Sequence, residues 1–192
     1  MADYSVTPWE VKGDIDYDRL VRDFGTSYID QSLINRVEKH TGKPHFMLKR
    51  KVFFSHRDFN WILDKYEKDE KFFLYTGRGP SGDTHLGHLL PWIFTQYLQE
   101  KFDVELYFQI TDDEKYMHDR SLTRKQVSDF SYENILDIIA LGFDPDKTFI
   151  FKNTEYIKTM YKISTDIAKH VTFSTVKGIF GFQNSSNIGM IF

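Results

Sequence analysis

A run of glycines between two apolar segments is the feature that most restricts the fold of this 192-residue chain. The segment Gly77-Arg78-Gly79-Pro80-Ser81-Gly82 follows an apolar run of strand length, residues 72–76, and precedes a helical pattern over residues 89–99. Glycine-rich turns between a strand and a helix expose backbone N–H groups where anions bind. The pattern therefore predicts a strand–loop–helix unit with a phosphate site at its turn.

Strand and helix patterns continue to alternate after this loop. The expected elements are strands at residues 104–110 and 148–151, a helix at residues 122–141, and a last helix around Met160, Ile163 and Ile167. This β-α-β-α-β order predicts an α/β fold in which residues 71–192 form the first half of a Rossmann-like catalytic domain. Both faces of such a sheet are normally covered, so we expect a truncated domain or a completing partner.

Residues 1–70 show a different pattern and are expected to form an N-terminal extension. The expected elements are a hairpin or arm over residues 1–26 around Trp9 and Gly13, a helix over residues 27–40 that stops at Gly42, and a second helix capped by Ser55 with an apolar face on Phe59, Ile62, Leu63 and Tyr66.

Composition excludes several classes of protein. Lys and Arg total 25 against 28 Asp and Glu, so no global basic field marks a nucleic-acid binder. The absence of cysteine excludes disulfides and thiolate metal sites. No signal-peptide pattern begins the sequence and no apolar run is long enough to span a bilayer, so we expect a cytoplasmic protein without a membrane partner.

His85 and His88 give the glycine loop its chemistry. Three residues apart at a helix start, they share a face where free N–H groups and the helix dipole attract anions. Gly87 between them leaves the backbone open to a nucleotide. Imidazole and amide donors would stabilise the charge that develops when the α-phosphorus of a triphosphate is attacked. We therefore predict His85 and His88 as catalytic residues, with ATP as substrate and Mg²⁺ on its phosphates.

Three other interpretations of the loop compete with this one. The glycine spacing also matches a dinucleotide fingerprint, but Pro80 interrupts it, and Asp103 and Glu105 lie at the start of the next strand instead of where a ribose-binding acid belongs. Asp83 with both histidines could instead hold a metal ion. Both histidines could also be ordinary surface residues.

His85-Leu86-Gly87-His88 resembles the HIGH motif of the class I aminoacyl-tRNA synthetases, and the segment Leu74-Tyr75-Thr76-Gly77-Arg78-Gly79-Pro80-Ser81 is similar to tryptophanyl-tRNA synthetases of the eukaryotic cytosolic type. Further similar blocks are Phe54-Ser55-His56-Arg57-Asp58, Gln109-Ile110-Thr111-Asp112-Asp113-Glu114-Lys115, His170-Val171-Thr172-Phe173 and Val176-Lys177-Gly178-Ile179-Phe180-Gly181-Phe182. The resemblance starts near Pro8 and covers nearly the whole chain, although the loop before His85 is one residue shorter than the family pattern.

The resemblance implies the N-terminal portion of a tryptophan–tRNA ligase, a homodimer that activates tryptophan with ATP and transfers it to tRNA(Trp). It implies ATP-binding residues Thr76, Arg78, Gly79, His85, Gly87 and His88, and tryptophan-binding residues Tyr75, Gly77, Gln109 and Glu114, with no resident metal. Tyr75 and Gln109 are expected near the carboxyl ends of two strands, where they would recognise the indole nitrogen while Glu114 holds the ammonium group. The segment around Trp9 would fold over the nucleotide pocket.

Plainer interpretations of these residues stay open. Tyr75 could pack in the core, Arg78 could be an exposed loop residue, and the acidic run from Asp112 to Glu114 could cap a helix or bind magnesium. No Lys-Met-Ser-Lys-Ser-like sequence and no anticodon-binding domain occur, so we expect the chain alone to be incomplete for aminoacylation. The alternative functions are another HIGH-motif enzyme, either a tyrosine-specific synthetase or a small-molecule nucleotidyltransferase, and a non-catalytic binding fragment.

Overall fold

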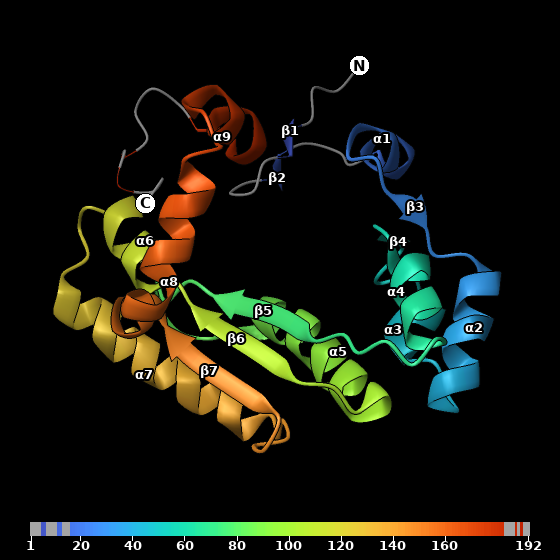
Figure 1. Ribbon diagram of the computed structural model, residues 1–192. Coiled ribbons are helices and arrows are strands. Elements are labelled where there is room, and N and C mark those ends of the chain that lie inside the picture. Colours follow the sequence, from blue (N-terminus) through green and yellow to red (C-terminus); the bar gives the residue numbers. More distant parts are fainter. Residues whose placement is uncertain (1–4, 7–10, 13–15, 183–186, 188, 190–192) are drawn as a thin grey trace.

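A parallel three-stranded sheet lies at the centre of the computed structural model, which describes residues 5–6, 11–12, 16–182, 187 and 189 (Figure 1). The strands follow one another in the order β5 (Leu74–Arg78), β6 (Leu106–Ile110) and β7 (Thr148–Lys152). Helix α5 (Leu86–Phe102) joins the first two strands, and α7 (Arg124–Ala140) lies between the second and third. The predicted β-α-β-α-β unit is confirmed.

The two faces of this sheet differ in what covers them. Leu106, Phe108 and Ile110 are fully buried on one face, where they pack with Trp92 of α5 and Ile138 of α7. Strand side chains alternate between faces, and the other face carries a row of aromatic side chains that are partly open to solvent. Its members include Phe73, Tyr75, Tyr107, Phe149 and Phe151. The described residues therefore bury one face of this parallel sheet closely and cover the other only in part, where Tyr156 packs on Phe149 and Phe151.

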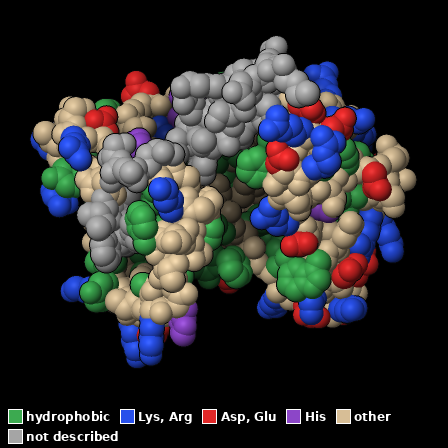
Figure 2. Space-filling view, turned by 90° about the horizontal axis from the view of Figure 1, so that it is seen from above, with side chains coloured by type: hydrophobic (Ala, Val, Ile, Leu, Met, Phe, Trp, Pro, Cys, Tyr) green, Lys and Arg blue, Asp and Glu red, His purple; other side chains and the backbone are tan. Residues whose placement is uncertain are grey.

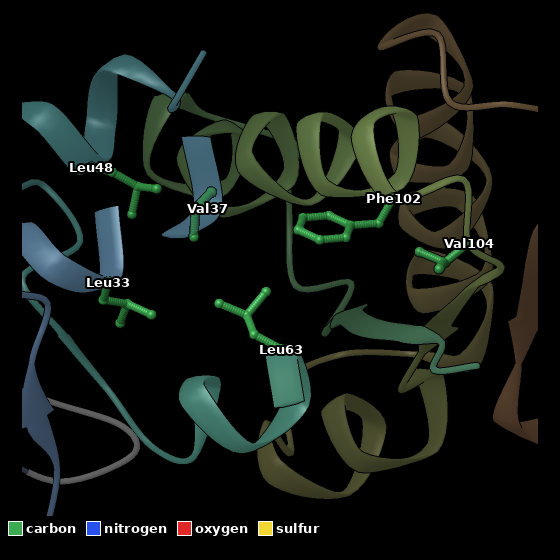
Figure 3. Packing of buried hydrophobic residues seen from close by; sticks show 6 residues of the cluster. All are labelled: Leu33, Val37, Leu48, Leu63, Phe102 and Val104. Atoms are coloured by element: carbon green, nitrogen blue, oxygen red, sulfur yellow. The ribbon is translucent and has the colours of Figure 1, made fainter. Parts of the chain in front are cut away.

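The N-terminal region packs against the end of α5. Its elements are β1 (Ser5–Val6), β2 (Val11–Lys12), α1 (Tyr17–Asp23), β3 (Ser27–Tyr28), α2 (Gln31–Thr41), α3 (Phe46–Lys49), β4 (Ser55–His56) and α4 (Phe59–Tyr66). Figure 3 shows the shared core, in which Leu33, Val37, Leu48 and Leu63 meet Phe102 and Val104. Burial of these side chains fixes the N-terminal region onto the part of the chain that contains the parallel sheet.

Several boundaries of the N-terminal elements were predicted wrongly. Strands β1 and β2 form an antiparallel pair, but Trp9 and Gly13 lie outside the described residues, and α1 was not predicted. Helix α2 ends as expected at Gly42, whose φ of 74° favours glycine. The cap expected at Ser55 is wrong, because Ser55 pairs with Tyr28 in a short sheet and Asp58 precedes α4 instead.

Three further helices follow the central strands. They are α6 (Asp112–His118), α8 (Asn153–Ala168) and α9 (Phe173–Phe180). Only α8 was predicted, because α6 and α9 are too short to show a clear apolar period. Within the described part of the chain, no helix is both long and apolar enough to cross a membrane.

Candidate functional site

The glycine segment begins inside the sheet. Strand β5 extends through Arg78, so Gly77 belongs to the strand and the loop starts at Gly79, not directly after Thr76 as predicted. Gly77 pairs with Gln109 of β6, and a Cβ atom at Gly77 would lie 2.9 Å from the Gln109 carbonyl oxygen. Glycine is therefore required here by the close approach of the two strands.

His85 and His88 meet at the N-terminus of α5. The helix starts at Leu86, three residues before the predicted start, and His85 is its N-cap rather than part of its first turn. The two imidazole centroids are 3.7 Å apart, and His88 also stacks on the buried Trp92 at 5.9 Å. The predicted juxtaposition of the histidines is present, with one ring on the cap and the other in the first turn.

Backbone hydrogen bonds determine which ring nitrogen carries the proton. The Gly87 N–H donates to His85 Nδ1 and the His85 N–H donates to His88 Nδ1, each at 3.2 Å. A neutral imidazole that accepts at Nδ1 carries its proton on Nε2. Burial, Arg78 and His85 together lower the pKa of His88, which favours this neutral form. Both rings can therefore offer an Nε2–H donor.

Gly87 allows the His85 ring to lie close to the backbone. A Cβ atom at Gly87 would lie 3.1 Å from both Cε1 and Nδ1 of His85. A larger residue would push the imidazole away by a few tenths of an ångström, so glycine permits the close packing of the ring over the backbone. The imidazole of His85 thus lies directly over the first turn of α5.

Arg78 and Asn134 bind the glycine loop from its buried side. Arg78 is 9% exposed, and its Nε donates to Asn134 Oδ1 of α7 at 2.8 Å. Both side chains also donate to the Gly82 carbonyl, from Arg78 Nη2 at 3.1 Å and from Asn134 Nδ2 at 3.0 Å. The alternative of an exposed loop arginine is wrong, because this guanidinium is buried and bonded to its own loop.

Tyr75 and Gln109 come together on the open face of the sheet. The Tyr75 hydroxyl donates to Gln109 Oε1, although Tyr75 is the second residue of β5 and not near its carboxyl end as predicted. Gln109 lies opposite Gly77, two residues further along β5, and the long phenol side chain of Tyr75 reaches it. Tyr75 is 62% exposed, which rules out simple core packing, and partial burial still raises its pKa.

An aromatic hollow of about 420 Å³ adjoins these groups. Its lining residues are Phe73, Tyr75, Tyr107, Phe149, Phe151 and Tyr156. Figure 2 shows hydrophobic side chains on the floor of a hollow between the part of the molecule that contains α6 to α9 and the part that contains α1 to α4. Flat apolar walls with a few polar groups at one end suit an aromatic ligand.

The acidic run forms the first turn of α6 and divides into separate roles. Asp112 is 8% exposed and accepts the Thr154 N–H at 3.1 Å, so it caps α8. Asp113 accepts the Glu114 N–H at 2.8 Å. Glu114 is half-buried, with Lys115 Nζ 3.4 Å from Oε1 and the Thr111 hydroxyl 3.3 Å from Oε2. Asp112 thus caps a helix, whereas Asp113 bonds its neighbour inside α6, whose N-cap Thr111 makes no side-chain cap bond.

Of the remaining predicted residues, Thr76 lies in the middle of β5 and Gly79 directly follows this strand. Thr76 is on the covered face of β5. The Lys115 side chain lies over Gly79, where a Cβ atom would come within 2.2 Å of the Lys115 Cε.

Among the described residues, no three His, Asp or Glu side chains are grouped so that they could hold a metal ion. The rival metal site of Asp83 with both histidines therefore has no support in this part of the chain.

Two asparagines of this region, Asn134 and Asn153, were missed by the sequence reasoning. Asn134 is fully buried in α7, and Asn153 bonds both Gln109 and Asp113. The one available signal was a polar residue on the apolar face of the helix at residues 124–140. Thr84 was also missed, and its buried hydroxyl has no hydrogen-bond partner within the described structure.

Comparison with known proteins gives one consistent group of relatives. The family model described as tRNA synthetases class I (W and Y) matches residues 67–190. The chain is 57% identical over 190 residues to the tryptophan–tRNA ligase of Saccharolobus solfataricus and 53% identical over 191 residues to that of Pyrococcus furiosus. Each alignment covers 99% of this chain, and 50% and 49% of the respective relative. The chain thus spans about half the length of the curated relatives it matches.

Solved structures show the same likeness. The tryptophanyl-tRNA synthetase of Plasmodium falciparum superposes with a TM-score of 0.88 at 45% identity, covering 92% of this chain and 49% of that one. The Encephalitozoon cuniculi tryptophanyl-tRNA synthetase, which was solved bound to tryptophan, gives a TM-score of 0.86 at 41% identity, covering 92% and 52%.

Proposed function

Because the chain belongs to the class I tRNA synthetases of the W and Y family, we propose that it supplies the amino-acid-activating half of a tryptophan–tRNA ligase. The observation that carries this proposal is the histidine pair at the start of α5, with both Nδ1 atoms occupied by backbone donors. Identities above 50% to tryptophan–tRNA ligases support tryptophan over tyrosine as the amino acid.

The proposed reaction needs no nucleophile from the protein. The tryptophan carboxylate attacks the α-phosphorus of ATP, a new acyl P–O bond forms, and the bond to the leaving pyrophosphate breaks. The Nε2–H groups of His85 and His88 would donate to phosphate oxygens as charge builds up on them. Thr76, Gly79 and Gly87 would offer ATP backbone contacts. Arg78 would contact phosphate, and its hydrogen bonds to the loop would also hold the shape of the loop.

Tryptophan would lie in the aromatic hollow. Tyr75 and Gln109 would accept the indole N–H, Gly77 would leave space beside them, and the Glu114 carboxylate would hold the α-ammonium group. An acceptor left without its partner is costly when buried, so this contact would disfavour phenylalanine.

Further expectations belong to the same proposal. The imidazole and backbone N–H donors around His85 suit phosphate oxygens and not a cation. Mg²⁺ would therefore bind the phosphates of ATP and enter with it as part of the substrate. Transfer of the activated tryptophan to tRNA(Trp), a cytoplasmic location and a homodimer follow from the family resemblance. The half-length match supports the expectation that aminoacylation needs more than these 192 residues.

Calorimetry with a non-hydrolysable tryptophanyl-adenylate analogue tests the proposal directly. The folded chain should bind this analogue and discriminate against the tyrosyl analogue, and a His85→Ala, His88→Ala double variant should bind it at least about tenfold more weakly. Amino-acid-dependent ATP–pyrophosphate exchange, stimulated by tryptophan alone, is the matching activity assay. A folded chain that releases no heat with the tryptophanyl analogue would be a non-catalytic fragment, and equal binding of the tyrosyl analogue would favour the tyrosine-specific alternative.

A further inference from the structure

A chain of side-chain hydrogen bonds continues behind Gln109 into α8 and α6. Gln109 Nε2 donates to Asn153 Oδ1 at 2.6 Å, and Asn153 Nδ2 donates to Asp113 Oδ1 at 2.8 Å. At its other end Gln109 accepts the Tyr75 hydroxyl. These hydrogen bonds therefore connect the open face of the sheet to the first residue of α8 and to the first turn of α6.

The Asp113 carboxylate determines which way each amide group in this series of hydrogen bonds points. Its Oδ1 also accepts the Glu114 backbone N–H at 2.8 Å, so this oxygen is fixed as an acceptor. The amide group of Asn153 must then turn its NH₂ towards Asp113 and its carbonyl towards Gln109. Gln109 in turn must direct its NH₂ towards Asn153, and its carbonyl faces Tyr75.

The reverse orientation of either amide would place like groups against each other. A flipped Asn153 would bring its carbonyl oxygen against the Asp113 carboxylate and its NH₂ against the NH₂ of Gln109. A flipped Gln109 would present its NH₂ to the Tyr75 hydroxyl and to any N–H donor in the hollow. Unpaired polar groups in a partly buried network are costly, so one orientation is strongly preferred.

We propose that Asn153 and Asp113 are positioning residues that set indole specificity by fixing the Gln109 carbonyl towards the tryptophan pocket. The inference rests on the proposed tryptophan site and adds two residues that do not touch the ligand. With its single proton donated to Gln109, the Tyr75 oxygen keeps lone pairs for the indole N–H. The Tyr75 oxygen and the Gln109 carbonyl thus both act as acceptors towards the pocket. The Asp113 carboxylate is the group that determines this orientation.

Asp113→Ala is the sharpest test because it removes the acceptor oxygen that fixes the direction of the Asn153 amide. The probes are L-tryptophan and its benzofuran analogue, in which an oxygen atom replaces the indole N–H. We expect the wild-type chain to prefer tryptophan, and Asp113→Ala and Asn153→Ser each to reduce that preference about three- to tenfold in the ratio of Kd values. Asp129→Ala makes the same substitution on the exposed surface of α7 and should leave the ratio unchanged.

The ratio separates positioning from general damage, because both ligands share the ammonium group and the ring shape. A variant that only loosens the fold weakens both ligands equally and overturns the inference. Side-chain amide NMR of the free protein is a second readout, in which the Gln109 amide should lose exchange protection in Asp113→Ala. A wild-type chain that binds neither ligand refutes the tryptophan site itself, whereas a wild-type preference that survives in both variants refutes only the role of Asn153 and Asp113.

Discussion

The imidazole rings of His85 and His88 lie 3.7 Å apart, and each accepts a backbone N–H of the turn that carries it through its Nδ1 atom. The turn thus fixes the tautomer of both rings before any ligand arrives. Preorganised donors of this kind need no rearrangement when charge develops on a substrate. Gly87 and Arg78 maintain the arrangement, one by its lack of a side chain and the other from behind the loop.

Gly87→Ala should separate stability from ligand binding. The added Cβ would lie 3.1 Å from the His85 ring and shift it by a few tenths of an ångström, so we expect up to about tenfold weaker binding of the tryptophanyl-adenylate analogue. Alanine is the better helix former, so the free energy of unfolding should stay equal or rise by up to about 1 kcal/mol. Gly178→Ala in α9 is the control, because a Cβ atom there meets no atom within 4 Å. Unchanged calorimetric binding in Gly87→Ala would contradict this role of the glycine.

Asn134→Ala should destabilise the fold and loosen the loop. The change leaves Arg78 Nε without its acceptor and removes one of two donors to the Gly82 carbonyl. We expect the free energy of unfolding in urea to fall by about 1–3 kcal/mol. Glu133→Ala on the exposed side of the same helix should change it by less than about 0.5 kcal/mol. Equal effects of the two substitutions would show that the buried amide has no special role.

The stability of the protein should contain a contribution from His88 that depends on pH. The pKa of His88 is lowered in the folded state, first by burial and then by Arg78 and His85. As pH falls below the unfolded value near 6.5, the unfolded chain binds a proton that the folded chain excludes, so the free energy of unfolding decreases. NMR titration of the ring and unfolding between pH 5 and 8 measure this. His88→Gln should have a flatter pH profile, and a His88 titration above 6.5 would contradict the prediction.

The N-terminal region and the part of the chain that contains the parallel sheet should unfold together. Leu63 of α4 is fully buried in a core that also contains Phe102 of α5 (Figure 3). We expect Leu63→Ala to lower the free energy of unfolding by about 2–5 kcal/mol in one cooperative transition. The exposed Trp61 on the same helix provides the control, and Trp61→Ala should cost less than about 1 kcal/mol. Two separate transitions would mean that the extension is an independent unit.

Local pattern was enough to predict the order of the three central strands and of helices α5, α7 and α8, and the pairing of His85 with His88. It was also enough for the family, because the HIGH-like motif and the blocks around it are continuous in sequence. Boundaries were less accurate. Gly77 was placed in a loop because glycine usually interrupts a strand, whereas the neighbouring strand at Gln109 requires it there.

The sequence by itself therefore determined the fold class, the family and the residues that form the turn of His85 and His88. The tertiary structure alone decided that Arg78 bonds Asn134, 56 residues away, and that Gln109 bonds Asn153, 44 residues away. Periodicity reports which face of a helix or strand is buried, but not which polar group lies opposite. Hydrogen bonds between distant residues depend on strand register and helix packing, and these appear only when the whole chain has folded.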